Sequence, residues 1–179
     1  MKSIFPTIVD ELEARTRIHD TLTVFCRGVD RKDWTLLLSA FHDDAIDDHG
    51  SVKGPAHEVL VPTLQLRHAN ITHSAHYLTN IAIHFVSTEA ASVESYVWVV
   101  QREQDPSSGT ERRTLAAVRY VDLIEERAGA WRISARTLTY GDIIPLTGEH
   151  EPFALPEAFS VQTRDGSDPV EEQERRLGI

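Results

Sequence analysis

The feature that most constrains the fold is a series of four strand-like runs in the second half of the chain. Each run is rich in β-branched and aromatic residues, which favour strands. Short turn-forming segments such as Ala128-Gly129-Ala130 separate the runs. Successive strands joined by short loops pair as an antiparallel meander. The four runs are Tyr77–Val86, Ala91–Arg102, Thr114–Glu125 and Trp131–Tyr140.

The first part of the chain has the periodicity of a long helix. Between about Thr7 and Val29, large apolar residues recur at spacings of four, three and four, which is the period of one helical face. This pattern predicts an amphipathic helix that ends near Gly28. Its apolar face consists of Ile18, Leu22, Phe25 and Val29.

Shorter elements follow the long helix. Asp33 can accept the free N–H groups of a second helix, which we expect to end near His42. The polar stretch from Ala45 to Val52 suits an edge strand with a turn. A third helix is expected to start at Pro55 and to reach about Arg67, with a kink or a break at Pro62.

The order of these elements predicts an α+β domain, in which helices pack on one face of a curved antiparallel sheet and leave room for a pocket. A chain of 179 residues with 41% hydrophobic residues can build one such core. We expect the domain to cover residues 1–145. Residues 146–179 form an extension that Phe153, Leu155 and Phe159 can anchor to the domain or to a neighbouring subunit, and its charged end from Gln162 is expected to be mobile.

Composition narrows the range of partners. Acidic residues outnumber basic ones by 28 to 18 and no stripe of Lys and Arg stands out, which argues against nucleic acid and against membranes. The first residues lack the apolar core of a signal peptide, and no run is long enough to span a membrane, so we expect a cytoplasmic protein. The single cysteine, Cys26, lies among apolar residues and is expected to be a buried thiol.

Asp30 is the first residue with potential chemistry. It follows Val29, the last residue of the predicted apolar face, so its carboxylate can point inward. A carboxylate at a helix C-terminus meets the negative end of the helix dipole and therefore favours a cationic or hydrogen-bond-donating partner. The neighbouring Arg31 and Lys32 offer the alternative, which is a solvated ion pair at the surface.

His76 enters the first long strand run. A carboxylate bonded to one imidazole nitrogen fixes the tautomer and raises the basicity of the other nitrogen, so Asp30 and His76 together would form a general base. The strand face that contains His76 is half polar and can meet either solvent or a functional cavity. Period-two alternation places His76, Leu78, Asn80, Ala82 and His84 on this face, and Tyr77, Thr79, Ile81, Ile83 and Phe85 on the other.

A metal site is the rival interpretation. Histidines and aspartates gather in His42-Asp43-Asp44, in Asp47-Asp48-His49 and at His68, His73 and His76. Their spacing matches no helical His-x-x-x-His motif, and acid-rich loops are usually solvated, so no metal is expected. The chain also lacks the nucleophile-elbow, phosphate-loop and dinucleotide-binding motifs, and no cofactor is expected.

Three segments together resemble the SnoaL-like branch of the nuclear transport factor 2-like superfamily. They are Val29-Asp30-Arg31-Lys32-Asp33-Trp34, His76-Tyr77-Leu78-Thr79-Asn80 and Gly129-Ala130-Trp131-Arg132-Ile133. The resemblance covers about residues 8–145 and is closest to the scytalone dehydratase and hexachlorocyclohexane dehydrochlorinase group. It implies a cone, with a curved antiparallel sheet wrapped around the long helix and an enclosed pocket. It also implies that His76 removes a proton, that Asp30 orients His76, and that water or HCl is eliminated without a cofactor.

Other positions depart from this group. Two tyrosines that help to polarise the substrate of the dehydratase correspond to Val29 and Asp48, and the lysine of the dehydrochlorinase corresponds to Phe25. Substrate and leaving group therefore do not transfer. The candidates for contacting a substrate are Asp48, His49, Asn80, Tyr120 and Tyr140.

The leading hypothesis is a cofactor-independent lyase of the dehydratase type, acting on a small, largely apolar, cyclic or aromatic substrate. Two alternatives share the fold. A ketosteroid-isomerase-like protein would return the proton to another carbon, and a non-catalytic protein would bind a small molecule or resemble a dioxygenase β subunit. Exposed sheet faces and the anchored extension favour a homo-oligomer, either a trimer or a dimer.

Overall fold

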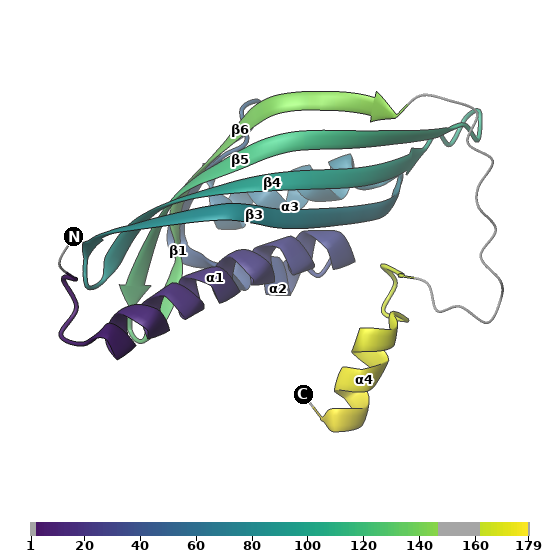
Figure 1. Ribbon diagram of the computed structural model, residues 1–179. Helices are drawn as coiled ribbons and strands as arrows, with labels where there is room; N and C mark the ends of the chain where they lie inside the picture. The colour runs from purple at the N-terminus through teal and green to yellow at the C-terminus, as the bar shows by residue number, and fades with distance from the viewer. Residues whose placement is uncertain (1–2, 147–161, 179) are drawn as a thin grey trace.

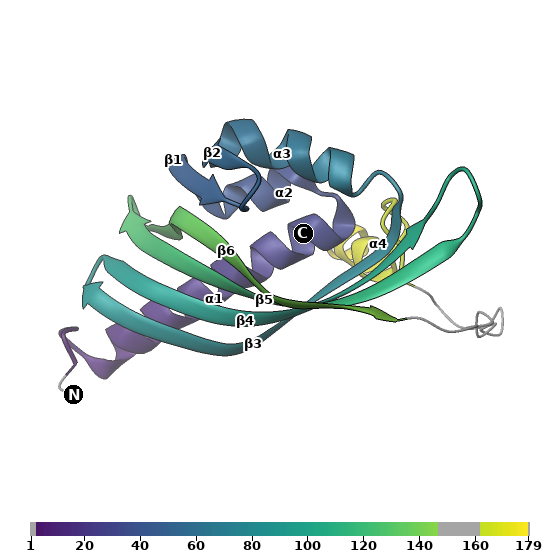
Figure 2. The ribbon, with the colours of Figure 1, turned by 90° about the horizontal axis from the view of Figure 1, so that it is seen from above.

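The structure, a computed structural model, describes residues 3–146 and 162–178. Figures 1 and 2 show that the four long strands curve past α1, with α2 and α3 on the same side of the sheet as α1. None of the described helices is long and apolar enough to cross a membrane. The helices are α1 (Ile8–Arg31), α2 (Trp34–Ser39), α3 (Ala56–Arg67) and α4 (Pro169–Leu177), and the strands are β1 (Phe41–Asp48), β2 (Lys53–Pro55), β3 (Ile71–Ser87), β4 (Ala90–Gln104), β5 (Glu111–Arg127) and β6 (Ala130–Leu146).

The sheet has six strands in the order β2-β1-β6-β5-β4-β3. Its strands β3 to β6 form the expected antiparallel meander. In contrast, β1 pairs in parallel with β6, where Asp47 lies opposite Arg136. The expected curved sheet is therefore mixed, with one parallel pair beside the antiparallel meander. The edge strand expected over Ala45–Val52 was wrong, because β1 starts at Phe41 and lies between β6 and the short edge strand β2.

The long helix α1 confirms the predicted amphipathic element. It starts at a capping box in which the side chains of Thr7 and Asp10 each accept a hydrogen bond from the other residue's backbone N–H. The helix continues beyond Gly28 and ends where Lys32 adopts the left-handed conformation. Asp30 therefore lies inside the last helical turn. The predicted apolar face is buried, with exposed fractions of 0% for Ile18 and Leu22, 1% for Phe25 and 2% for Val29.

The second helix packs closely against the end of α1. Asp33 caps α2 as expected, and its carboxylate accepts the backbone N–H of Leu36 at 2.9 Å. The two helices approach most closely at Gly28, where a Cβ atom would lie 2.6 Å from the backbone nitrogen of Leu37. α2 ends at Ser39, earlier than predicted, because the next residues belong to β1.

The third helix differs in detail from the prediction. Pro55 precedes α3 as its cap residue, and the helix continues through Pro62 to Arg67 without a break. An internal proline leaves one helix carbonyl without its usual N–H donor. α3 nevertheless continues past Pro62 as one element of 12 residues. α3 contributes Leu64 and Arg67, and its C-terminal cap residue contributes His68, to the cavity described below.

A β-bulge in β3 changes which residues face the helices. The register shifts between Thr79 and Ile81, and Asn80 has a φ of 42°. One extra residue reverses the alternation, so the predicted division of faces holds only up to the bulge. Beyond it Ile81, Ile83 and Phe85 pack on the core, whereas Asn80 and His84 are exposed.

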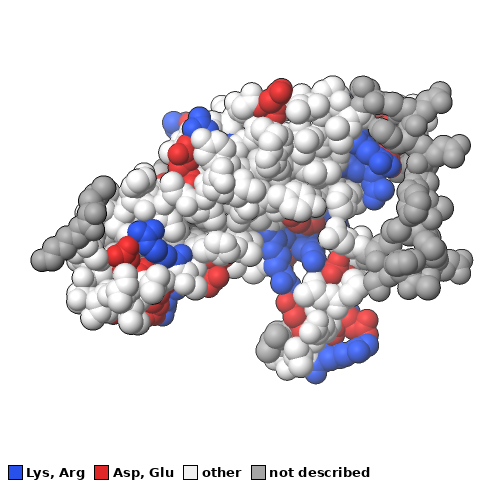
Figure 3. Space-filling view, in the orientation of Figure 1, with Lys and Arg blue, Asp and Glu red and all other residues white. Residues whose placement is uncertain are grey.

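The chain end that we expected to be mobile contains α4. Figure 3 shows charged side chains of both signs where α4 joins the rest of the chain. Arg27 of α1 pairs with Glu174 at 2.7 Å, and Arg31 lies 3.3 Å from Asp168, which caps α4. The proposed anchors Phe153, Leu155 and Phe159 lie outside the described residues.

Candidate active site

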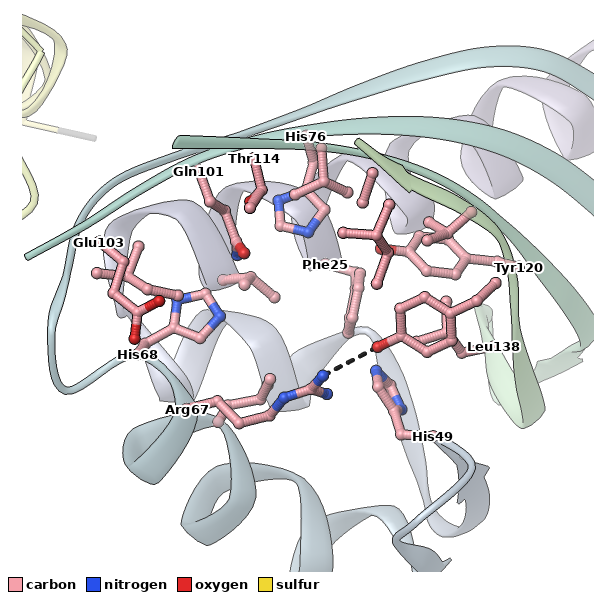
Figure 4. A pocket seen from close by; sticks show the side chains of 18 of the residues that line it. Phe25, His49, Arg67, His68, His76, Gln101, Glu103, Thr114, Tyr120 and Leu138 are labelled. Atoms are coloured by element: carbon pink, nitrogen blue, oxygen red, sulfur yellow. Dashed lines mark hydrogen bonds between the residues drawn. The ribbon is translucent and has the colours of Figure 1, made fainter. Parts of the chain in front are cut away.

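A cavity of about 300 Å³ lies between the helices and the concave face of the sheet. Phe25 and Val29 of α1, together with Val118 and Leu138 of the sheet, make much of its wall apolar. Polar side chains are also present, and Figure 4 shows His76 and His49 on opposite sides of the cavity. A site of this kind holds an apolar molecule while a few polar groups fix its orientation.

The structure places Asp30 directly behind His76, which lines this cavity. Asp30 Oδ1 lies 2.6 Å from His76 Nδ1, and Asp30 Oδ2 accepts the backbone N–H of His76 at 2.9 Å. The hydroxyl of Ser74 donates a third hydrogen bond to the carboxylate, also at 2.9 Å. An ionised carboxylate can only accept hydrogen bonds, so Nδ1 of His76 carries a proton, and in the neutral imidazole Nε2 then has a free lone pair. The geometry is that of an oriented general base.

Arg164 holds the backbone around this pair. Its guanidinium donates to the carbonyl oxygens of Asp30, Val29 and Ile71, the last two at 2.9 and 2.8 Å. It also donates to Nδ1 of His68 at 3.0 Å. Burial, reinforced by the positive charge of Arg164, lowers the pKa of His68 to about 3, so His68 is a neutral acceptor. Nothing in the breaker-rich sequence before Arg164 indicates this role.

His49, one of the predicted substrate contacts, lines the cavity and has a carboxylate partner. Its Nδ1 is hydrogen-bonded to Asp47, whose side chain is 1% exposed. Asp48 was also predicted to contact a substrate. Its carboxylate instead pairs with Lys53 at 2.9 Å, and Asp48 is not among the residues that line the cavity. Asp47, which was not among the predicted site residues, is therefore the aspartate that contacts His49, as period-two alternation of residues 47 and 49 would allow.

The remaining candidates occupy different positions. Tyr120 lines the inner part of the cavity at 3% exposure, and burial raises its pKa well above the usual range. Tyr140 lines the cavity, is half exposed, and accepts a hydrogen bond from Arg67 at 3.0 Å, drawn as the dashed line in Figure 4. Asn80 occupies the bulge of β3 and does not line the cavity.

A buried ion pair that the sequence did not reveal supports the inner wall. The guanidinium of Arg136 makes two hydrogen bonds of 2.8 Å to Asp122 and lies 4.1 Å from the ring centres of Phe25 and Tyr120. Both charged side chains are completely buried. Burial opposes the charge of Arg136, but the ion pair with Asp122 outweighs it and raises the pKa of Arg136 above its usual range.

The rival metal site finds no counterpart in residues 3–146 and 162–178, where no group of three or more His, Cys, Asp or Glu side chains is placed to hold a metal ion. His42, for example, bonds the backbone carbonyl of Glu125 at 2.9 Å. Cys26 is buried as expected, and burial raises the pKa of its thiol to about 12.

Comparison with known families agrees with this geometry. The family model of the SnoaL-like domain matches residues 10–137. The chain belongs to the SnoaL-like family. The matched range includes both members of the Asp30–His76 pair, and it extends from the first helix of this SnoaL-like chain into β6. The expected family is therefore confirmed.

Individual relatives of this SnoaL-like protein include elimination enzymes. Hexachlorocyclohexane dehydrochlorinase 1 of Sphingobium indicum is 31% identical over 160 residues, which cover 84% of this chain and 96% of that one. The structure of a type 2 hexachlorocyclohexane dehydrochlorinase matches with a TM-score of 0.73 at 25% identity, over 84% of this chain and 99% of the other.

A third similar protein is a candidate scytalone dehydratase from Novosphingobium aromaticivorans. It matches with a TM-score of 0.68 at 19% identity, over 87% of this chain and all of the other, so it speaks for the fold alone. Together these likenesses confirm the predicted α+β fold and make the SnoaL-like protein a distant homologue of lyases.

Proposed function

We propose that this SnoaL-like protein is a cofactor-independent lyase that acts on a small, largely apolar, cyclic or aromatic molecule. His76 removes a proton from carbon, and water or another leaving group departs from the neighbouring carbon. Asp30 keeps the imidazole in the reactive tautomer and stabilises the imidazolium that forms. The observation that carries the proposal is the 2.6 Å contact between Asp30 and His76 at the wall of a cavity.

The surroundings of the pair support this chemistry. The carboxylate of Asp30 receives hydrogen bonds from Ser74 and from the backbone of His76, so its position is fixed before a substrate arrives. The side chain of His76 is only 8% exposed, which keeps most water away from the imidazole. A cavity of about 300 Å³ is at the lower end of the range of ligand sites, which favours a molecule of one or two rings.

The proposal can be tested with α-tetralones that carry a hydroxyl, methoxy or chloro group β to the ketone. Loss of any of these groups, followed by enolisation, yields the same fluorescent α-naphthol. The wild-type protein should accelerate this elimination, and the product from the hydroxy compound should be lighter by one water molecule. His76→Gln and Asp30→Asn should each lower kcat/KM by about 10²-fold or more.

His84→Gln is the matched control, because His84 lies on the same strand but is exposed. It should leave the rate unchanged. A product of unchanged mass would favour an isomerase instead. If no tetralone is converted, or if His76→Gln retains wild-type activity, the proposed function is wrong.

A further inference from the structure

The cavity contains a second histidine–carboxylate pair. His49 follows the end of β1, and His76 lies on β3, on the far side of β6, β5 and β4 in the sheet. Both histidines nevertheless line the same cavity because the sheet is strongly curved. Figure 4 shows His49 next to the hydrogen bond between Arg67 and Tyr140, across the cavity from His76. A molecule in the cavity therefore has an imidazole on each side.

The two pairs differ in how their carboxylates are satisfied. Asp30 receives donors on both oxygens. Asp47 is bonded to His49 through Oδ2, but its Oδ1 is buried and finds no partner in the described residues. A buried carboxylate with an unused oxygen gains most from a positive charge nearby.

The charged side chains buried behind His49 also carry more negative than positive charge. Arg136 lies opposite Asp47 in the pairing of β1 with β6. Its Nε and Nη2 are bonded to Asp122, and its Nη1 is buried without a hydrogen-bond partner in the described residues. The buried group thus contains two carboxylates, those of Asp47 and Asp122, and one guanidinium. An imidazolium at His49 would bring this group to zero net charge. His49 thus lies between this carboxylate-rich buried group and the cavity, opposite His76.

We propose that His49, held by Asp47, is the general acid of the elimination and protonates a leaving oxygen atom. This inference rests on the proposed function and specifies its leaving group, which would be a hydroxyl or alkoxy group. His76 takes the proton from carbon, the electrons of the C–H bond form the new double bond, and the C–O bond breaks toward oxygen. The proton from Nε2 of His49 completes water or an alcohol, and exchange with solvent returns both histidines to their starting states.

The nature of the leaving group explains why a second histidine matters. Hydroxide and alkoxide are strongly basic and leave readily only when they are protonated during bond cleavage. Chloride is a stable anion and needs no proton. An acid placed opposite the base therefore favours the loss of water over the loss of HCl.

The tetralone series separates these cases because every member gives the same α-naphthol. His49→Gln should lower kcat/KM for the hydroxy and methoxy compounds by about 10²-fold, and for the chloro compound by less than about threefold. Asp47→Asn should show the same selectivity with a smaller effect. The matched control is His57→Gln, because His57 is an exposed histidine that lies 4.0 Å from the carboxylate of Asp43 outside the cavity.

Each outcome decides a separate question. If His49→Gln slows all three compounds equally, or none of them, His49 is not the acid and the inference is wrong while the proposed function stands. If the wild type converts none of them, or if His76→Gln is fully active, the proposed function fails first.

Nitrogen NMR of wild-type protein labelled in its histidines provides a measurement that does not depend on a variant's folding. At the pH of the assay, Nε2 of His49 should carry a proton and Nε2 of His76 should not. The opposite distribution would overturn the assignment of acid and base.

Discussion

The guanidinium of Arg164 donates a hydrogen bond to the backbone carbonyl oxygen of Asp30, across 134 residues of sequence. The carbonyl groups at the end of a helix have no partner within the helix, and a cation there also complements the helix dipole. Arg164 therefore caps α1 and at the same time fixes the backbone of the residue that orients His76. The segment that follows the domain thus contributes to the candidate active site.

Replacing Arg164 should affect both stability and activity. Arg164→Ala removes several charge-assisted hydrogen bonds to carbonyl groups, and we expect the free energy of unfolding in urea to fall by about 1–3 kcal/mol. The value of kcat should fall by about 10-fold because the backbone at Asp30 is no longer fixed. Arg175→Ala is the control, since within the described part of the chain Arg175 bonds only a carbonyl of its own helix. A variant of Arg164 as stable and as active as the control would contradict this role.

His68 should make the protein sensitive to acid. Its pKa is about 3 in the folded protein, because of burial and of Arg164, but about 6.5 in an unfolded chain. Between these values the unfolded state binds a proton that the folded state does not, so stability is lost as the pH falls from about 6.5 toward 3. Between pH 7 and pH 5 the wild type should lose about 1–2 kcal/mol more than His68→Gln does. Urea titrations at both pH values measure this difference. If the wild type and His68→Gln lose the same free energy of unfolding between pH 7 and pH 5, His68 does not titrate in this way.

Substitutions of Asp122 and Arg136 should have strongly coupled effects on the free energy of unfolding. Asp122→Leu leaves a guanidinium buried without its main partner, which should lower the free energy of unfolding by about 3–5 kcal/mol. The double variant Asp122→Leu/Arg136→Met removes both charges and should regain most of this loss. A double-mutant cycle measured by chemical denaturation tests the prediction, and additive effects would rule out the coupling.

We expect Asn80 to affect the stability of the protein, through the conformation of β3, rather than the binding of a substrate. Its φ of 42° is compatible with Asn and Gly but strained for a β-branched residue. We expect Asn80→Val to lower stability by about 1–2 kcal/mol and Asn80→Gly to change it by less than about 1 kcal/mol. Because Asn80 lies outside the cavity lining, Asn80→Gly should keep the wild-type KM. A large rise in KM without a loss of stability would return Asn80 to the list of substrate contacts.

The sequence predicted the parts of the molecule that depend on local periodicity. The burial of Val29 follows from the spacing of α1, and it places the next residue, Asp30, at the edge of the core. The four strand runs and their short turns likewise define the meander. In β3, however, one extra residue at Asn80 reversed the faces of Ile81, Ile83 and Phe85, and a single Asn within a strand run is a weak signal for a bulge.

Contacts between distant segments could not be predicted in this way. Asp47 lies opposite Arg136 because β1 pairs in parallel with β6, and no local pattern specifies that choice of partner. The same is true of Arg164, whose four acceptors belong to three separate segments. Residues of the site that sequence analysis overlooked are therefore mainly those placed by long-range pairing.

The parallel pairing of β1 with β6 also determines when the cavity of a newly made chain can be completed. β6 is the last strand of the sheet, and the contact between Asp48 and Thr137 closes a loop that contains most of the domain. Contacts this far apart in sequence form slowly, since their loop entropy must be overcome first. A chain still emerging from the ribosome without β6 can form α1 and the first hairpins, but β1 is not yet joined to the meander, so His49 is not held across from His76. The cavity between the two histidines is then completed late, together with the closure of the sheet.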